Sequence, residues 1–141
     1  MRVVVIGATG NIGTALVRAC VNDPRIDHVV GVARRVPTWE LPGVSWHAAD
    51  ISRDDLESLL RGADAVVHLA WLIQPSHDVE LLEAVNVLGT KRVLEAAAQA
   101  RVPVVVVGSS IGAYATGPPR GRVEEHWPTL GIPGNLYSQQ K

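Results

Sequence analysis

Met1-Arg-Val-Val-Val-Ile6 runs directly into Gly7-Ala-Thr-Gly10-Asn-Ile-Gly13 at the start of this 141-residue chain. A short apolar run that ends at a glycine is typical of a buried strand. The segment that follows, residues 14–20, places Leu16, Val17 and Cys20 on one side of a helix. The sequence therefore predicts a strand, a glycine-rich turn and a helix, which together form the first half of a βαβ unit.

The three glycines meet three different requirements of a turn that holds a dinucleotide. Gly7 can adopt the backbone angles of a tight turn, and Gly10 lets the main chain approach a pyrophosphate. Gly13 lets the helix lie close to the strand, and the free N–H groups at the helix start attract phosphate charge. An ordinary glycine-rich connection is the alternative, but the patterns on both sides of the turn favour nucleotide binding.

Strand and helix patterns alternate along the rest of the chain. Four more apolar runs predict strands at residues 27–33, 44–48, 63–69 and 103–107. Ser52-Arg-Asp-Asp55 predicts a capped helix through Leu60, and a second, long helix is predicted from about Asp78 to Ala100. This alternation implies an α/β fold with a doubly wound parallel sheet, a Rossmann fold, in strand order 3-2-1-4-5. Ligands of such a sheet bind at the carboxyl ends of its strands.

The last part of the chain has a different composition and no regular apolar pattern. From Tyr114 onward, proline and glycine interrupt every period and predict a loop. A helical segment resumes at Tyr137 and runs to Lys141.

The composition indicates one soluble domain, residues 1–141. A net charge of −1 gives no basis for binding nucleic acid or an anionic membrane. The first predicted strand begins at residue 2, which leaves no room for a signal peptide, and no apolar stretch is long enough to span a membrane. We therefore expect a cytoplasmic protein. The one cysteine, Cys20, is expected in the core, and the spacing of the five histidines predicts no metal site.

The spacing Gly7-x-x-Gly10-x-x-Gly13, together with Thr9 and Tyr137-Ser-Gln-Gln-Lys141, resembles the short-chain dehydrogenase/reductase superfamily. The closer likeness is to its extended branch, the NAD-dependent epimerase/dehydratase family, and it covers the whole chain. The resemblance implies a truncated NAD(P)-binding Rossmann domain, incomplete on its C-terminal side, with the C-terminal substrate domain absent. We therefore expect the chain by itself to be a poor catalyst.

The end of the second predicted strand bears on the choice of cofactor. NAD-binding Rossmann domains carry an acidic residue there, which hydrogen-bonds the adenosine ribose. This chain has Ala33 followed by Arg34 and Arg35, whose forked guanidinium groups suit a 2′-phosphate. The sequence thus favours NADP over NAD, and the alternative is that both arginines are merely solvated on a loop.

The resemblance implies further cofactor contacts near the glycine turn and the third strand. Thr9, Asn11 and Ile12 are expected to line the turn itself. Asp50, followed by Ile51, matches an aspartate that bonds the adenine amino group in the family. A turn or helix-capping aspartate explains Asp50 nearly as well.

The segment after the fourth strand is also implied to lie along the cofactor. It is Leu69-Ala70-Trp71, in which Trp71 replaces the alanine usual in the family. The large ring either narrows the substrate side of the site or is simply buried. Asn86, in a segment that resembles the family's Asn-Val-x-Gly-Thr, is expected to make a buried structural hydrogen bond.

Tyr137 and Lys141 are four residues apart, which places them on one face of a helix. Free tyrosine has a pKa near 10, and a nearby ammonium group stabilises its phenolate. The resemblance implies that Tyr137 moves the proton of the substrate hydroxyl and that Lys141 holds the cofactor ribose. It further implies that Ser110, after the fifth strand, binds the substrate oxygen. These three are the predicted catalytic residues, although Tyr-x-x-x-Lys alone also occurs by chance.

The resulting hypothesis is an NAD(P)-dependent oxidoreductase of the epimerase/dehydratase type. It would transfer hydride at a secondary alcohol or ketone of a nucleotide sugar or a small carbonyl compound. The alternative is a non-catalytic NADP-sensing regulatory protein on the same fold, which would not need the proton relay. Because the fifth strand is the last one in the sequence, we also expect self-association into a homo-oligomer through its free edge.

Overall fold

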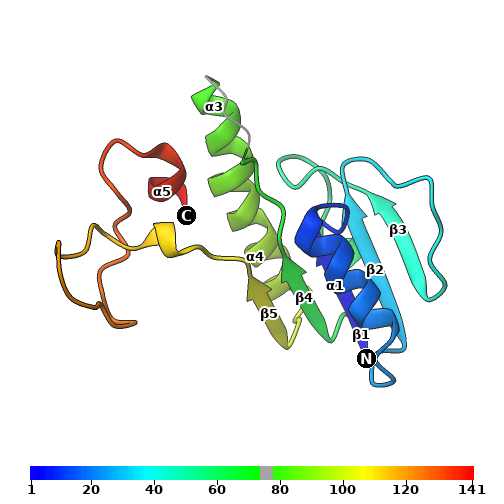
Figure 1. Ribbon diagram of the computed structural model, residues 1–141. Coiled ribbons are helices and arrows are strands. Elements are labelled where there is room, and N and C mark those ends of the chain that lie inside the picture. The colour runs from blue at the N-terminus through cyan, green and yellow to red at the C-terminus, as the bar shows by residue number, and fades with distance from the viewer. Residues whose placement is uncertain (74–77) are drawn as a thin grey trace.

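The computed structural model describes residues 1–73 and 78–141, which are built around one parallel sheet (Figure 1). Its strand order is β3-β2-β1-β4-β5, as the alternation of strands and helices predicts. All neighbouring strands are parallel, so each connection between them crosses over one face of the sheet. The strands are β1 (Arg2–Ile6), β2 (His28–Ala33), β3 (Val44–Ala48), β4 (Ala65–His68) and β5 (Val104–Val107).

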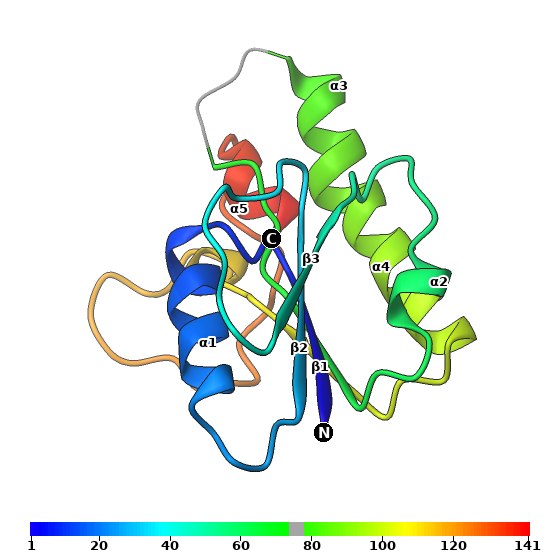
Figure 2. The same ribbon diagram turned by 90° about the vertical axis from the view of Figure 1, so that its right-hand side faces the viewer.

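Helices cover the two faces of the sheet unequally. Helix α1 (Asn11–Val21) lies on one face, while α2 (Glu57–Leu60) and α4 (Thr90–Gln99) lie on the other (Figure 2). The predicted long helix is continuous in space as α3 (Val79–Leu82), the π-helical segment η1 (Glu83–Gly89) and α4. No helix among the described residues has the length and apolar character needed to cross a membrane.

Two apolar cores result from the alternation of side chains along β1. Val4 and Ile6 face α2 and α4, where Val66 and Val93 are fully buried beside them. Val3 and Val5 face α1 and pack with Val17 and Cys20. Cys20 is thus a core residue, as expected, and burial, with Asp23 as the second cause, raises the pKa of its thiol. The two cores hold β1 at the centre of the sheet.

Strand β5 is less covered than the other strands. Its four valines, Val104–Val107, are each 37–49% exposed. Val105 pairs with Val66 and therefore points to the α4 face, while Val106 pairs with Val67 and points to the α1 face. Both faces of the strand thus carry exposed apolar side chains, and its outer edge has no strand partner among the described residues.

The chain beyond β5 forms short elements and loops. A 3₁₀ turn, η2 (Ile111–Ala113), leads into an irregular segment that extends away from the sheet (Figure 1). The segment returns to α5 (Leu136–Gln140), which contacts η1 and η2. The sequence correctly predicts the loop and the resumed helix.

Two helix starts differ from the prediction. Helix α1 begins at Asn11 rather than Thr14, because Gly10 serves as its N-cap. Helix α2 begins at Glu57, and Asp55 accepts hydrogen bonds from the N–H groups of Glu57 and Ser58. Ser52 does not cap this helix; it donates to Asp50 instead. A local turn at Asp50 therefore displaces the predicted capping box.

Candidate functional site

The glycine turn between β1 and α1 is held against the segment that follows β4. Gly7 has φ +86°, and a Cβ there would lie 2.6 Å from the N atom of Ala70. The N–H groups of Gly7 and Ala8 both donate to the carbonyl oxygen of Val32, which fixes the turn to β2. Glycine at this position thus allows both the turn and the close approach of two strand ends.

Gly13 has the packing role that the sequence predicts for it, and Gly10 leaves its backbone uncovered. A Cβ at Gly13 would lie only 2.2 Å from the oxygen of Gly7, so the helix packs directly on the turn. A Cβ at Gly10 would meet only that same oxygen, at 3.4 Å, and would otherwise face the open clefts that Gly10 lines. The backbone at Gly10 is thus open to a ligand.

The start of α1 provides donors for an anion. The first intrahelical bond runs from the N–H of Thr14 to the oxygen of Gly10, at 2.8 Å. The N–H groups of Asn11, Ile12 and Gly13 come before it and are those that a helix start leaves to an outside acceptor. Together with the helix dipole they suit a phosphate group.

The first of two clefts, called here the β2 cleft, lies at the carboxyl ends of β1, β2 and β4. It has a volume of about 210 Å³. Nine of the predicted cofactor-binding residues line it: Gly7, Thr9, Gly10, Arg34, Asp50, Ile51, Leu69, Ala70 and Trp71.

The end of β2 places only one of the two arginines at this cleft. Ala33 is buried, and its oxygen accepts from the N–H of Ala49 on the neighbouring connection. Arg34 lines the cleft, whereas Arg35 is exposed and lies outside the lining of the cleft in the described part of the chain. The structure therefore separates the predicted pair at the bend that follows β2, although both side chains are exposed.

Asp50 combines a turn role with a place in the cleft. Its Oδ1 accepts from the N–H of Ser52 at 3.0 Å and from the hydroxyl at 2.7 Å. Arg53 lies 3.8 Å from Oδ2. The Ser52 hydrogen bond lowers the pKa of the Asp50 carboxyl, and the charges of Arg53 and Arg34 act in the same direction. Asp50 thus makes the turn contacts of the alternative explanation, and it is also one of the residues that line the β2 cleft.

The second cleft, the Tyr137 cleft, joins the glycine turn to α5. It has a volume of about 350 Å³ and is lined by Gly7, Gly10, Asn11, Ile12, Gly13, Leu69, Trp71, Ile73, Gly108, Ser109, Tyr137 and Lys141. It shares Gly7, Gly10, Leu69 and Trp71 with the β2 cleft. A long ligand can therefore pass from the end of β2, over the start of α1, to Tyr137.

Lys141 is held within the Tyr137 cleft by the loop after β5. Its Nζ donates to the oxygen of Gly108 at 2.6 Å. The N–H of Gly108 in turn donates to the oxygen of His68, which ties this loop to β4. Burial lowers the pKa of the Lys141 ammonium. Tyr137 and Lys141 line the same cleft, as the four-residue spacing predicts.

Ser110 lies beside the cleft rather than in its lining. Its Oγ accepts from the N–H of Gly112 at 3.1 Å and so caps η2. A Cβ on Gly112 would lie 3.4 Å both from this Oγ and from the ring of Tyr137, so the two side chains flank one glycine. Ser109, which is not among the predicted catalytic residues, lines the cleft directly.

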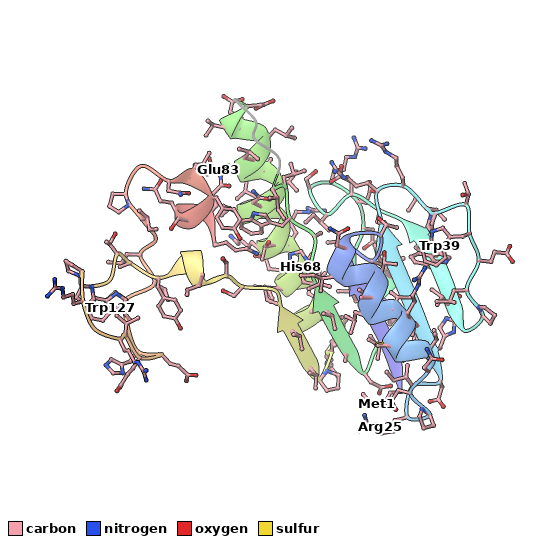
Figure 3. All side chains as sticks on the ribbon, viewed as in Figure 1. Met1, Arg25, Trp39, His68, Glu83 and Trp127 are labelled. Carbon is pink, nitrogen blue, oxygen red and sulfur yellow. The ribbon has the colours of Figure 1, made fainter. Side chains whose placement is uncertain are left out.

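His68 is a buried neutral group at the end of β4 (Figure 3). Its Nε2 lies 2.9 Å from the hydroxyl oxygen of Thr90 on α4. Burial, with the charge of Lys141 as a second cause, lowers the pKa of His68 to about 4. Its Nδ1 has no hydrogen-bond partner among residues 1–73 and 78–141, so the expectation of a satisfied structural histidine holds for one ring nitrogen only.

Asn86 makes the buried structural hydrogen bonds that the sequence predicts. Its Oδ1 accepts from the N–H of Leu72 at 2.8 Å, and its Nδ2 donates to the oxygen of Leu72 and to Oε1 of Gln140. One side chain thus connects the segment after β4 to helix α5. This network fixes the positions of Trp71 and of the Tyr137 helix relative to each other.

Two further positioning residues were not predicted. Arg92 donates to the oxygens of Ile51 and Asp54, and so holds the loop beneath the β2 cleft against α4. Ser138 is 2% exposed; its hydroxyl donates to the oxygen of Gly112 and accepts from the N–H of Ile132. The only sequence signal for Ser138 is its place inside the Tyr137–Lys141 segment.

Comparison with known proteins places these features in one family. The model of the NAD dependent epimerase/dehydratase family matches residues 3–141. The chain is 28% identical to sterol-4-alpha-carboxylate 3-dehydrogenase, decarboxylating, of Saccharomyces cerevisiae, over 99% of the chain and 43% of that protein.

Two solved structures show the same arrangement of elements. One is MoeE5 in complex with UDP-glucuronic acid and NAD, with 33% identity and a TM-score of 0.81, over 99% of this chain and 46% of MoeE5. The other is a short-chain dehydrogenase/reductase superfamily protein from Agrobacterium tumefaciens with bound NAD, with 30% identity and a TM-score of 0.84, over 100% and 42%. The chain thus spans less than half the length of each of these relatives.

Proposed function

The chain belongs to the NAD-dependent epimerase/dehydratase family, and we propose that it supplies the cofactor site and proton relay of an NAD(P)-dependent oxidoreductase. The observation that carries this proposal is the Tyr137 cleft. Its lining joins the start of α1, where free N–H groups suit a phosphate, to Tyr137 and Lys141. A dinucleotide that lies along both clefts brings its nicotinamide end to that pair.

The residues present fit such a cofactor. Gly10 leaves its backbone open, the first N–H groups of α1 face an acceptor, and Asp50 and Arg34 lie at the far end. When bound, the nicotinamide would accept or donate a hydride. The Tyr137 hydroxyl would give or take the proton of the substrate oxygen, and Lys141 would hold the ribose and favour the phenolate. Ser110, or Ser109 in the cleft lining, would donate to the same oxygen.

The lining of the Tyr137 cleft is suited to an apolar alcohol or ketone. Ile12 and Ile73 are 72% and 76% exposed there, and Trp71 lies beside them. Lys141 is the one cationic side chain among the described residues that line this cleft. The yeast relative is by name a sterol-4-alpha-carboxylate 3-dehydrogenase, and an apolar sterol alcohol would fit this lining; a nucleotide sugar such as the UDP-glucuronic acid bound to MoeE5 is the alternative.

We propose NADP as the preferred cofactor, although both solved relatives carry NAD. The support is that Ala33 presents no carboxylate at the end of β2 and that Arg34 lines the cleft there. Arg34→Ser should weaken NADPH binding by about 1–3 kcal/mol and change NADH binding little. Arg35→Ser is the matched control, because Arg35 lies outside this lining. Calorimetry that finds equal NADPH and NADH affinities for the unsubstituted chain would count against the preference.

The enzymatic proposal itself is tested with Tyr137→Phe. Cofactor affinity should stay within about twofold, because the ring is retained, whereas hydride transfer to a panel of sterol-like and sugar-nucleotide substrates should be lost. A chain that binds neither NADPH nor NADH at millimolar concentration contradicts the proposal. Tight cofactor binding with no turnover for any substrate, in a longer protein that joins this chain to a C-terminal substrate domain, would instead favour the regulatory alternative.

A further inference from the structure

Trp71 lies where three hollows of the site meet. It lines the β2 cleft, the Tyr137 cleft and a groove between α4 and the loop after β5. Its backbone neighbour Leu72 is bonded through both N–H and oxygen to Asn86, so the ring starts from a fixed segment.

The ring makes its closest charged contact with Lys141. The Nζ atom of Lys141 lies 3.8 Å from the centroid of the Trp71 ring. An ammonium within about 6 Å of an indole centroid is attracted by the negative face of the ring. The attraction is stronger where water is excluded, and Lys141 is sufficiently buried that its pKa is lowered.

The same ring also contacts the tyrosine of the pair. Trp71 and Tyr137 have ring centroids 6.1 Å apart at an interplanar angle of 81°, an edge-to-face arrangement. With the oxygen of Gly108 on one side of Lys141 and the indole face on another, the ammonium has two fixed neighbours. Its remaining N–H donors are therefore left for the cleft.

We propose that Trp71 is a positioning residue, which holds the Lys141 ammonium against Gly108 and turns its remaining donors toward the bound cofactor. This inference rests on the proposed function, because it gives Lys141 a cofactor to hold. A small residue at position 71 would leave the ammonium with the single hydrogen bond to Gly108. Trp71 thus acts through Lys141 and not by touching the reacting atoms.

The contact has a direct spectroscopic test, because the chain has only two lysines, Lys91 and Lys141. Lys91 is exposed and paired with Glu95, so it is an internal reference. In protein labelled with ¹³C at the lysine ε-carbon, the ε-methylene protons of Lys141 should be shifted upfield by the ring current of Trp71. Trp71→Leu should remove this shift, and Trp71→Phe should retain part of it. An unshifted Lys141 signal in the unsubstituted chain would overturn the inference without reference to any cofactor.

The functional part is tested by NADPH affinity, measured by calorimetry. Trp71→Leu should weaken binding about five- to thirtyfold, and Trp71→Phe should restore most of the loss. In a Lys141→Met background, Trp71→Leu should add less than about twofold, because its effect passes through the ammonium. The control is Trp39→Leu, which removes a ring beside a cation, Arg18 at 6.0 Å, outside all three hollows.

The outcomes separate this inference from the proposed function. If Trp71→Leu weakens NADPH equally with and without Lys141, or if Trp71→Phe does not rescue binding, the ring only fills space and the inference is overturned. If the unsubstituted chain binds no cofactor, the proposed function fails, and the positioning role fails with it even where the ring-current shift is present. Circular dichroism that matches between variants excludes misfolding as the cause.

Discussion

Gly10 and Gly13 lie in the same turn, yet alanine should disturb them in different ways. A Cβ at Gly13 would lie 2.2 Å from the oxygen of Gly7. Real Cβ atoms essentially never come closer than 3.0 Å to another heavy atom, so this contact is 0.8 Å too short. The clashing atoms are backbone, fixed to β2 by two hydrogen bonds, so α1 itself must move away from the sheet. A Cβ at Gly10 would lie 3.4 Å from the same oxygen, and φ there is −74°, which alanine adopts freely.

The expected sizes of the two effects follow from this geometry. In Gly13→Ala, overpacking against a rigid backbone should lower the free energy of unfolding by about 3 kcal/mol. The higher helix propensity of alanine offsets about 1 kcal/mol of this loss. The net loss in the free energy of unfolding should be about 2 kcal/mol. Gly10→Ala should cost no more than about 1 kcal/mol, the difference between glycine and alanine at the N-cap that Gly10 forms. Its methyl group would nevertheless occupy the backbone approach of the pyrophosphate and weaken NADPH binding by at least about tenfold.

The assays are urea unfolding followed by circular dichroism and calorimetric titration with NADPH. We expect Gly13→Ala to have the lower free energy of unfolding. We expect Gly10→Ala to keep most of its stability but to bind NADPH weakly. Equal unfolding free energies for the two variants would refute the steric argument. Unchanged NADPH affinity in Gly10→Ala would refute the assignment of the turn to the pyrophosphate.

Three more predictions concern buried polar groups and the sheet edge. The pKa of His68 is lowered to about 4 in the folded chain, so the unfolded state binds more protons between pH 6.5 and 4. The free energy of unfolding should therefore fall by about 2 kcal/mol between pH 7.5 and 5. In His68→Asn, urea unfolding should show a smaller fall over the same pH range. Asn86→Ala should cost about 1–3 kcal/mol in the same assay by leaving the N–H of Leu72 unpaired, with Asn86→Asp, which keeps that acceptor, losing less. The exposed valines of β5 should drive self-association, detectable by light scattering and weakened by Val106→Lys; a monomer at millimolar concentration before substitution would contradict this.

The order of the elements was predictable because it rests on signals carried by near neighbours. Apolar runs, glycine breaks and helical spacing place all five strands, and the handedness of parallel connections then leaves few strand orders, of which 3-2-1-4-5 is typical of a Rossmann fold. The glycine turn was predictable for the same reason. Each of Gly7, Gly10 and Gly13 is needed for a backbone angle or a close approach that involves residues only a few positions away. The boundaries were less exact where a local hydrogen bond competed, as at Asp50 and Ser52.

The sequence by itself thus determined the sheet, the turn and most of the residues that line the β2 cleft at that turn. Only the tertiary structure decided which of those residues meet. It separated Arg34 from Arg35, used Ser110 as a cap beside the cleft, and brought Trp71 onto Lys141, seventy positions further along the chain. Such contacts depend on the path of loops and on long-range bonds such as Asn86 to Gln140, and no periodicity along the chain encodes them.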